Sequence, residues 1–238
     1  MAFTYVVALI NALPIRQPLQ HMRALAGPGA TVAFTHLSRA SSASLHASFS
    51  TSEPGLADAA CYQEGVLVRM QSADVLLEKV CLLDPRAEKM LAPEDGDGRP
   101  PPSSSSSSSS SLSLHGDDPP RDRTGELRAL GFPTRHLGPV QMTTDTALGV
   151  TKMVVQDKGR PPFLTADGET DLGYLPMVQC GWRTFPISSC GQDQPTIVFN
   201  KHESVEMPFR YIADGKEPRL PPGMKEHLHE DMNKSFDF

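Results

Sequence analysis

The sequence predicts an α/β protein built on a parallel sheet, and two apolar runs and one amphipathic segment carry that prediction. Residues 5–10 (YVVALI) are a continuous β-forming run, and residues 80–83 (VCLL) are another that ends at a turn signal, Asp84-Pro85. Short runs without polar alternation are typical of parallel strands buried on both faces. Residues 143–156 instead repeat apolar side chains at helical spacing. A chain of 238 residues suits one such domain, or one domain with a small appendage.

The first part of the chain, residues 1–78, is expected to open with a strand near residues 5–10. Residues 1–52 contain no Asp or Glu, and their last part is rich in serine. An acid-poor, serine-bearing N-terminus is also typical of organellar transit peptides. The scarcity of arginine and the β-forming run favour a strand of the folded domain, and with it a cytoplasmic protein.

The second part, residues 79–238, begins with the buried strand at residues 80–83. Its carboxyl end is followed by a loop, and open α/β sheets bind their ligands beside such ends. Leu83 and Asp84 are therefore candidate ligand-binding residues. Asp84 can also cap the turn that follows, and the two roles are compatible.

Two segments of this second part lack the pattern of a regular element. Residues 96–115 include nine consecutive serines and a proline-rich start, which predicts a flexible, solvated loop. Residues 158–196 are studded with Gly, Pro and Cys and predict an irregular insert.

The remaining segments have recognisable boundaries. Residues 124–130 predict a short helix that Thr124 caps and Gly131 ends, and residues 132–136 a strand. The helix at residues 143–156 has Thr143 or Thr144 as its N-cap and an acidic residue in its first turn, and its apolar face holds Ala147, Val150, Thr151 and Val154. A polar helix is expected at residues 225–232.

Charge and composition bear on the partner. The formal net charge is −6 and the isoelectric point about 5.7, which favours a basic protein partner over contacts with nucleic-acid phosphates. The four cysteines show no Cys-x-x-Cys pair, and the His227-x-His229 pair has no further ligands, so no metal site is expected. No apolar stretch approaches the roughly 20 residues of a membrane span, so we expect a soluble protein.

Three motifs indicate a family: DDPPRDRT at residues 117–124, LGPVQMTTDTA at 137–147 and NKHESVEMPFRY at 200–211. With them the chain resembles the fungal SPOUT-class S-adenosylmethionine (SAM)-dependent protein arginine methyltransferases. The resemblance covers roughly residues 79–95, 116–157 and 198–238. It implies a SPOUT-like parallel sheet with a C-terminal trefoil knot, SAM as the cofactor, and arginine methylation of a small-subunit ribosomal protein.

The resemblance also implies roles for individual residues. The cofactor would be bound by residues at the ends of strands and in the following loops, namely Leu83, Asp84, Gly116, Asp117, Leu137, Gly138, Met142, Thr143 and Thr144. Because the pKa of arginine exceeds about 12, its methylation needs carboxylates that orient the guanidinium and accept a proton. The candidates for this catalytic role are Asp118, Asp122, Glu203 and Glu206.

One departure from the family leaves alternatives open. Where the family has a hydrophobic strand and a Gly-rich turn before the Asp-Asp-Pro-Pro motif, this chain has the serine tract. Loss of that strand would leave the knot incomplete. A catalytically inactive or misassembled relative is therefore one alternative to the protein methyltransferase. A SPOUT RNA methyltransferase is a second alternative, against which the acidic balance counts.

Overall fold

The computed structural model describes residues 3–8, 16–49, 54–97, 110–113, 124–138, 141–158, 163–164, 170–171, 195–201, 203–214 and 217–234. Among these residues six strands form a parallel sheet in the order β3-β2-β1-β5-β4-β6. The strands are β1 (Thr4–Ala8), β2 (Thr31–Thr35), β3 (Asp58–Cys61), β4 (Cys81–Leu83), β5 (Ser110–Ser113) and β6 (Thr134–Arg135). The predicted α/β class with a parallel sheet is confirmed, and the sheet takes strands from both sides of residue 78.

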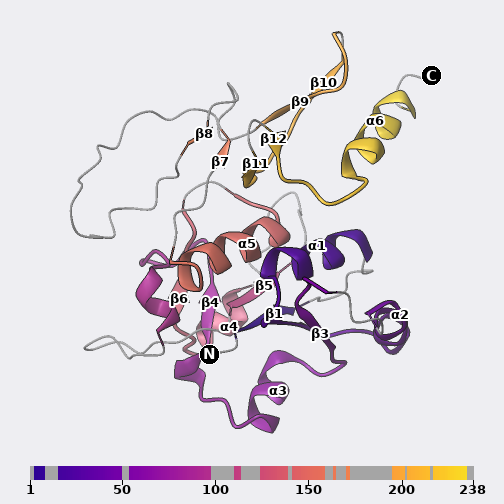
Figure 1. Cartoon of the computed structure of the whole chain (residues 1–238). Coiled ribbons are helices and arrows are strands. Elements are labelled where there is room, and N and C mark those ends of the chain that lie inside the picture. Colours follow the sequence, from indigo (N-terminus) through magenta and orange to yellow (C-terminus); the bar gives the residue numbers. More distant parts are fainter. Residues whose placement is uncertain are drawn as a thin grey trace.

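Helices cover both faces of this sheet. They are α1 (Arg16–Ala26), α2 (Arg39–Phe49), α3 (Val66–Ser72), α4 (Gly125–Ala129) and α5 (Thr144–Val155), with 3-10 turns at Leu77–Lys79 and Pro93–Gly96. Side chains alternate along β1, so Tyr5 and Val7 join the core beneath α1 and α5, whereas Val6 packs with residues of α3 on the other face. Figure 1 shows α1 and α5 side by side over one face and α3 beneath the other.

Several predicted elements are confirmed within a residue or two. The run at residues 80–83 is β4, buried along its whole length, and burial raises the pKa of the Cys81 thiol to about 12. The helix expected at 124–130 is α4, ended by Gly131 at φ 84°. The helix expected at 143–156 is α5, with Val150, Thr151 and Val154 buried. The polar helix at the end of the chain is α6 (Met224–Lys234).

The serine tract corrects the prediction of a loop without a strand. Its end forms β5, which lies between β1 and β4, with Ser111 opposite both Val6 and Leu82. A strand depends on backbone N–H and C=O groups, and serine supplies these as well as an apolar residue does. The serine side chains gave no strand pattern, and the prediction therefore missed a strand in the middle of the sheet.

The C-terminal region adds a small second core. β9 (Thr196–Val198) and β10 (Ser204–Glu206) form an antiparallel pair, as do β11 (Ala213–Asp214) and β12 (Glu217–Pro218). Buried Ile197, Met207 and Tyr211 pack there with Leu228 of α6. The next residue, Ile212, belongs to the main core instead. A Cβ built at Gly149 of α5 would lie 2.7 Å from the Ile212 side chain, so this glycine is where the C-terminal segment docks.

The insert predicted over residues 158–196 contains two short antiparallel strands, β7 (Phe163–Leu164) and β8 (Thr170–Asp171). Most of its other residues lie outside the described ones. Among the helices that the structure describes, none combines the length and apolar character that a membrane span requires.

The position of β5 gives a direct prediction. Ser111→Pro removes a backbone N–H from the central strand, so we expect the free energy of unfolding to fall by about 2 kcal/mol or more. Ser111→Ala keeps the N–H group and is the matched control, with a change below about 0.5 kcal/mol. Urea unfolding followed by circular dichroism measures both. Equal stability of the two variants would show that this strand does not form.

Candidate functional site

Asp84 lies at the carboxyl end of β4 and joins three parts of the chain. Its side chain is buried, and Oδ1 accepts hydrogen bonds from the Arg86 backbone N–H at 2.9 Å and from the Thr124 hydroxyl at 3.1 Å. The Arg128 guanidinium of α4 binds both carboxylate oxygens, through Nε to Oδ2 and through Nη2 to Oδ1 at 2.9 Å. The predicted cap of the turn after β4 is therefore confirmed.

The pKa of Asp84 agrees with its role as the cap of this turn and the partner of Arg128. Burial alone would raise the pKa of its carboxyl group, but the hydrogen bonds from Arg128, the Arg86 N–H and Thr124 lower it overall. A carboxylate that already accepts these bonds holds α4 against β4. Asp84 thus shapes the end of β4, and its part in binding a cofactor stays a prediction.

The segment after β6 runs between two other parts of the chain. The backbone of His136 pairs with the 89–91 segment, accepting from the Leu91 N–H at 3.0 Å and donating to the Lys89 carbonyl at 2.9 Å. Farther along, Met142 forms a parallel bridge with Arg210, whose N–H donates to the Gln141 carbonyl at 2.9 Å. Three segments far apart in sequence therefore lie beside one another at the carboxyl edge of the sheet.

Gly138 occupies a conformation that side chains rarely adopt, with φ 107°. Its N–H donates to His136 Nδ1 at 3.0 Å. A Cβ built there would have Arg210 Nη1 at 4.0 Å as its nearest contact, so the space above this glycine is open. Leu137, just before it, is buried in the main core. A backbone turn with free space above it is suited to close approach by a ligand.

The start of α5 is a buried polar cluster. Thr143 is the N-cap residue, and its hydroxyl lies 2.9 Å from the Thr146 hydroxyl. Thr144 and Asp145 are buried, and His21 of α1 lies against Asp145, with Nδ1 2.9 Å from Oδ2. The Thr143 and Thr144 hydroxyls, which the sequence predicts to bind the cofactor, therefore belong to this polar cluster. The Thr143 hydroxyl is already engaged within the protein.

The same cluster shifts two pKa values. Burial would raise the pKa of Asp145, but hydrogen bonds from His21, Thr143 and the Thr146 N–H lower it overall. The pKa of Tyr211 is raised, first by burial and then by the negative charge of Asp145. The effect of Asp145 on the pKa of Tyr211 shows an electrostatic interaction between the start of α5 and the C-terminal segment.

Glu203 and Glu206 lie on the β9–β10 hairpin. Glu203 is partly buried, accepts a hydrogen bond from the Asn200 side-chain amide, and has Oε2 3.3 Å from His229 Nε2 of α6. Glu206, at the end of β10, is exposed. The chain leads from Glu206 through buried Met207 to the segment at Arg210, which contacts the 141–142 loop.

The structure thus brings together Asp84, Leu83, Leu137, Gly138, Met142, Thr143 and Thr144 at the carboxyl edge of the sheet. Gly116, Asp117, Asp118 and Asp122 lie outside the described residues. Sequence reasoning missed two members of this region. Arg210 was within a quoted motif without a role, and His21 lies 124 residues from Asp145, a pairing that no local pattern indicates.

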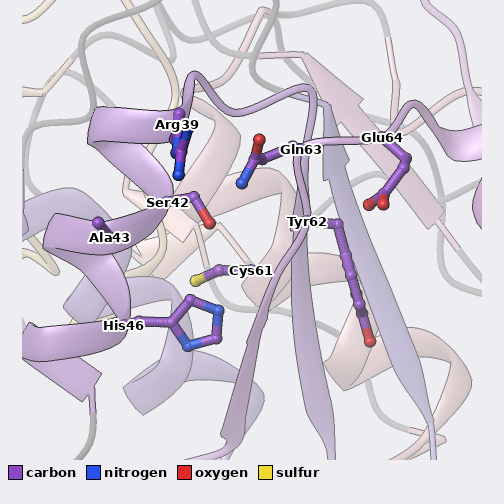
Figure 2. Close-up of a pocket in the computed structure, with 8 residues that line it drawn as sticks. All are labelled: Arg39, Ser42, Ala43, His46, Cys61, Tyr62, Gln63 and Glu64. Carbon is purple, nitrogen blue, oxygen red and sulfur yellow. The ribbon is translucent and has the colours of Figure 1, made fainter.

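A separate cavity of about 460 Å³ lies between α2 and the end of β3. Figure 2 shows Ser42 and His46 of α2 facing Cys61 of β3, and Arg39 and Gln63 also line the cavity. β3 and the β4–β6 pair are at opposite ends of the strand order, and none of the predicted site residues lines this cavity. The cavity is therefore distinct from the site at β4 and β6. Within the described part of the chain, no three His, Cys, Asp or Glu side chains gather as a metal site would require.

An α/β protein that gathers loops at the carboxyl edge of a parallel sheet belongs to the class of proteins that bind a small ligand there. Comparison with known proteins gives the family. A sequence model of the SFM1-like protein arginine N-methyltransferases matches residues 19–235. The chain is 36% identical over 164 residues to protein arginine N-methyltransferase SFM1 of Saccharomyces cerevisiae, and the match covers 67% of this chain and 62% of the yeast protein.

The fold is similar to that of solved yeast SFM1 structures. The complex of yeast SFM1 with SAM gives a TM-score of 0.64 at 26% identity and covers 97% of this chain and 92% of that one. The complex with SAH gives 0.62 at 26% identity, with 94% of each chain covered. The chain belongs to the SFM1-like family of protein arginine N-methyltransferases. The family match includes residues 19–78, where the quoted motifs gave no resemblance.

The lowered pKa values predict an acid-sensitive fold. Asp84 and Asp145 stabilise the protein above the pKa of an unfolded aspartate, about 3.9, and that stabilisation is lost as the pH falls below it. An Asp84→Asn/Asp145→Asn double variant should therefore lose less stability than the wild type between about pH 6 and 3. Urea unfolding at a series of pH values tests this, with exposed Asp58→Asn as control. The same pH slope in the double variant and the wild type would contradict the assignment.

Proposed function

We propose that this protein transfers a methyl group from SAM to an arginine side chain of a protein. The observation that carries the proposal is the arrangement of residues 136–138 and 141–144. Gly138 forms an open turn, His136 pairs with the 89–91 segment and Gln141 with Arg210, in a chain of the SFM1-like family. Yeast SFM1, which this chain resembles in fold, has been solved with SAM.

The residues at this edge fit the cofactor. Open space above Gly138 leaves room for a ligand against the backbone, and Leu83, Leu137 and Met142 supply apolar surface for an adenine ring. The backbone at residues 141–144 can offer polar groups at the start of α5. We propose these residues, with Thr144, as the cofactor site, and Gly116 and Asp117 as its continuation.

Bound SAM supplies an electrophilic methyl group on a sulfonium. The protein must hold one guanidinium nitrogen in line with that methyl group and take up the proton that the nitrogen loses. We propose that Glu203 and Glu206 pair with the guanidinium, because two carboxylates can orient its planar fork and accept the proton. Asp118 and Asp122 are proposed to assist from the cofactor side.

A small-subunit ribosomal protein is the proposed substrate, and the net charge of −6 supports a basic partner. We place the reaction in the cytoplasm, which the free thiols of Cys61 and Cys81 support. We also propose that the C-terminal segment completes a trefoil knot. Its passage beside residues 141–142 and its docking on Gly149 support this topology.

Calorimetric titration with SAM tests the cofactor site. We expect micromolar binding by the wild type and a dissociation constant raised at least about fivefold in Gly138→Ala, because a side chain at positive φ strains this loop. Gly55→Ala is the matched control, since Gly55 also has positive φ, at 92°, and free space around it, but lies in the turn before β3. Absence of binding by folded wild-type protein would refute the proposed function.

Removal of the two glutamates tests the arginine site. Glu203→Gln and Glu206→Gln should each lower kcat by about tenfold or more and leave SAM affinity unchanged, because the lost group accepts the proton. Glu226→Gln, an exposed glutamate of α6, is the control.

The assay for these variants uses radiolabelled SAM with purified small-subunit ribosomal proteins or ribosomal RNA as acceptors, followed by analysis of the hydrolysed products. Methylarginine would support the proposal. Methylated nucleosides alone would show that the protein is an RNA methyltransferase instead.

A further inference from the structure

His21 of α1 and Asp145 of α5 form a buried polar pair between the two helices. The His21 and Asp145 side chains are 7% and 6% exposed, and Nδ1 lies 2.9 Å from Oδ2. Farther along the same contact, Leu25 of α1 packs near Gly149 of α5. A buried polar pair between two helices calls for an explanation, because removing its groups from water is costly.

Stability alone is a weak explanation. Removing a histidine and a carboxylate from water is costly, and a well-packed apolar pair in their place is often as stable. What the pair supplies in addition is a fixed direction for the carboxylate. That carboxylate lies in the first turn of α5, directly after the loop that we propose to bind the cofactor.

The bonds of Asp145 show what a fixed direction controls. Besides His21, it accepts hydrogen bonds from the Thr143 side chain and from the Thr146 N–H. These bonds set the entry of the loop into α5, since Thr143 is the N-cap. With its hydroxyl held inside the protein, Thr143 leaves the backbone of residues 141–144 as the face of the loop that can meet a ligand.

His21 itself lies on a firmly packed helix. Leu19 and Met22 of α1 are fully buried, and Arg23 donates from Nε to the Ala57 carbonyl at 2.9 Å. On its other side, the loop is held through the bond between the Arg210 N–H and the Gln141 carbonyl. The loop is thus fixed from both sides, by α1 through Asp145 and by the C-terminal segment through Gln141.

We propose that His21 is a positioning residue for cofactor binding, which acts by orienting Asp145 and thereby the loop at residues 141–144. This inference rests on the proposed function. His21 makes no contact with the cofactor in this scheme. Its loss lowers SAM affinity because the loop is no longer held in one conformation before binding.

The test compares three variants by SAM titration and by thermal unfolding. His21→Leu removes the donor at similar size, and we expect the dissociation constant for SAM to rise about tenfold. His21→Asn places an amide N–H near the position of Nδ1 and should recover most of the affinity. Leu25→Ala weakens the α1–α5 contact without touching Asp145, and should lower Tm but leave the affinity unchanged.

The outcomes separate the possibilities. If His21→Leu binds SAM like the wild type, or if Leu25→Ala loses as much affinity at a similar loss of Tm, the positioning role is wrong and the proposed function stands. If the wild type itself does not bind SAM, both proposals fall together. Should His21→Leu not fold, Asp145→Asn takes its place, and unchanged affinity in that variant overturns the inference.

Discussion

The fold depends on the backbone hydrogen bonds of β5. This strand pairs with β1 on one side and β4 on the other, and no direct pairing joins those two strands among the described residues. Without β5 the sheet would be two pieces, β3-β2-β1 and β4-β6. The carboxyl ends that form the candidate site all lie on the second piece, whereas α1, which carries His21, packs on the first. A strand made from the end of a serine tract therefore aligns both halves of the site.

The helices reinforce this alignment. α1 follows β1 and α5 follows β6, so their contact over one face of the sheet ties the two pieces together a second time. The Tyr5 hydroxyl of β1 also donates to Gln156 at the end of α5, at 3.2 Å. The C-terminal segment also packs on α5, since the Ile212 side chain lies against Gly149. These contacts hold residues 141–144, which we propose to bind the cofactor, in place.

The sequence predicted the elements that depend on local patterns and missed the contacts between residues that are distant in sequence. β4 and α5 were predicted because a continuous apolar run and a helical repeat are local patterns that burial directly explains. β5 was missed because serine side chains give no such pattern while the backbone pairs normally. The loop residues from Leu137 to Thr144 were placed through resemblance of motifs. The partner His21 could not be found this way, because its contact with Asp145 spans 124 residues of chain and leaves no local signal. Arg210 lay within a quoted motif, but no pattern in that motif indicated its contact with Gln141.

Asp84 and Asp145 differ from Glu203 and Glu206, the two glutamates that we propose as catalytic, and the difference bears on the proposed chemistry. Asp84 and Asp145 are buried, each accepts several hydrogen bonds, and both have lowered pKa values. A carboxylate in that state is a poor proton acceptor, since uptake of a proton would cost it those bonds. Glu203 and Glu206 remain within reach of solvent, and Glu206 in particular is exposed at the end of β10. Glu203 and Glu206 therefore suit the proposed role of receiving a proton from arginine better than Asp84 and Asp145 do, whereas the two aspartates are suited to hold β4 and α5 in place.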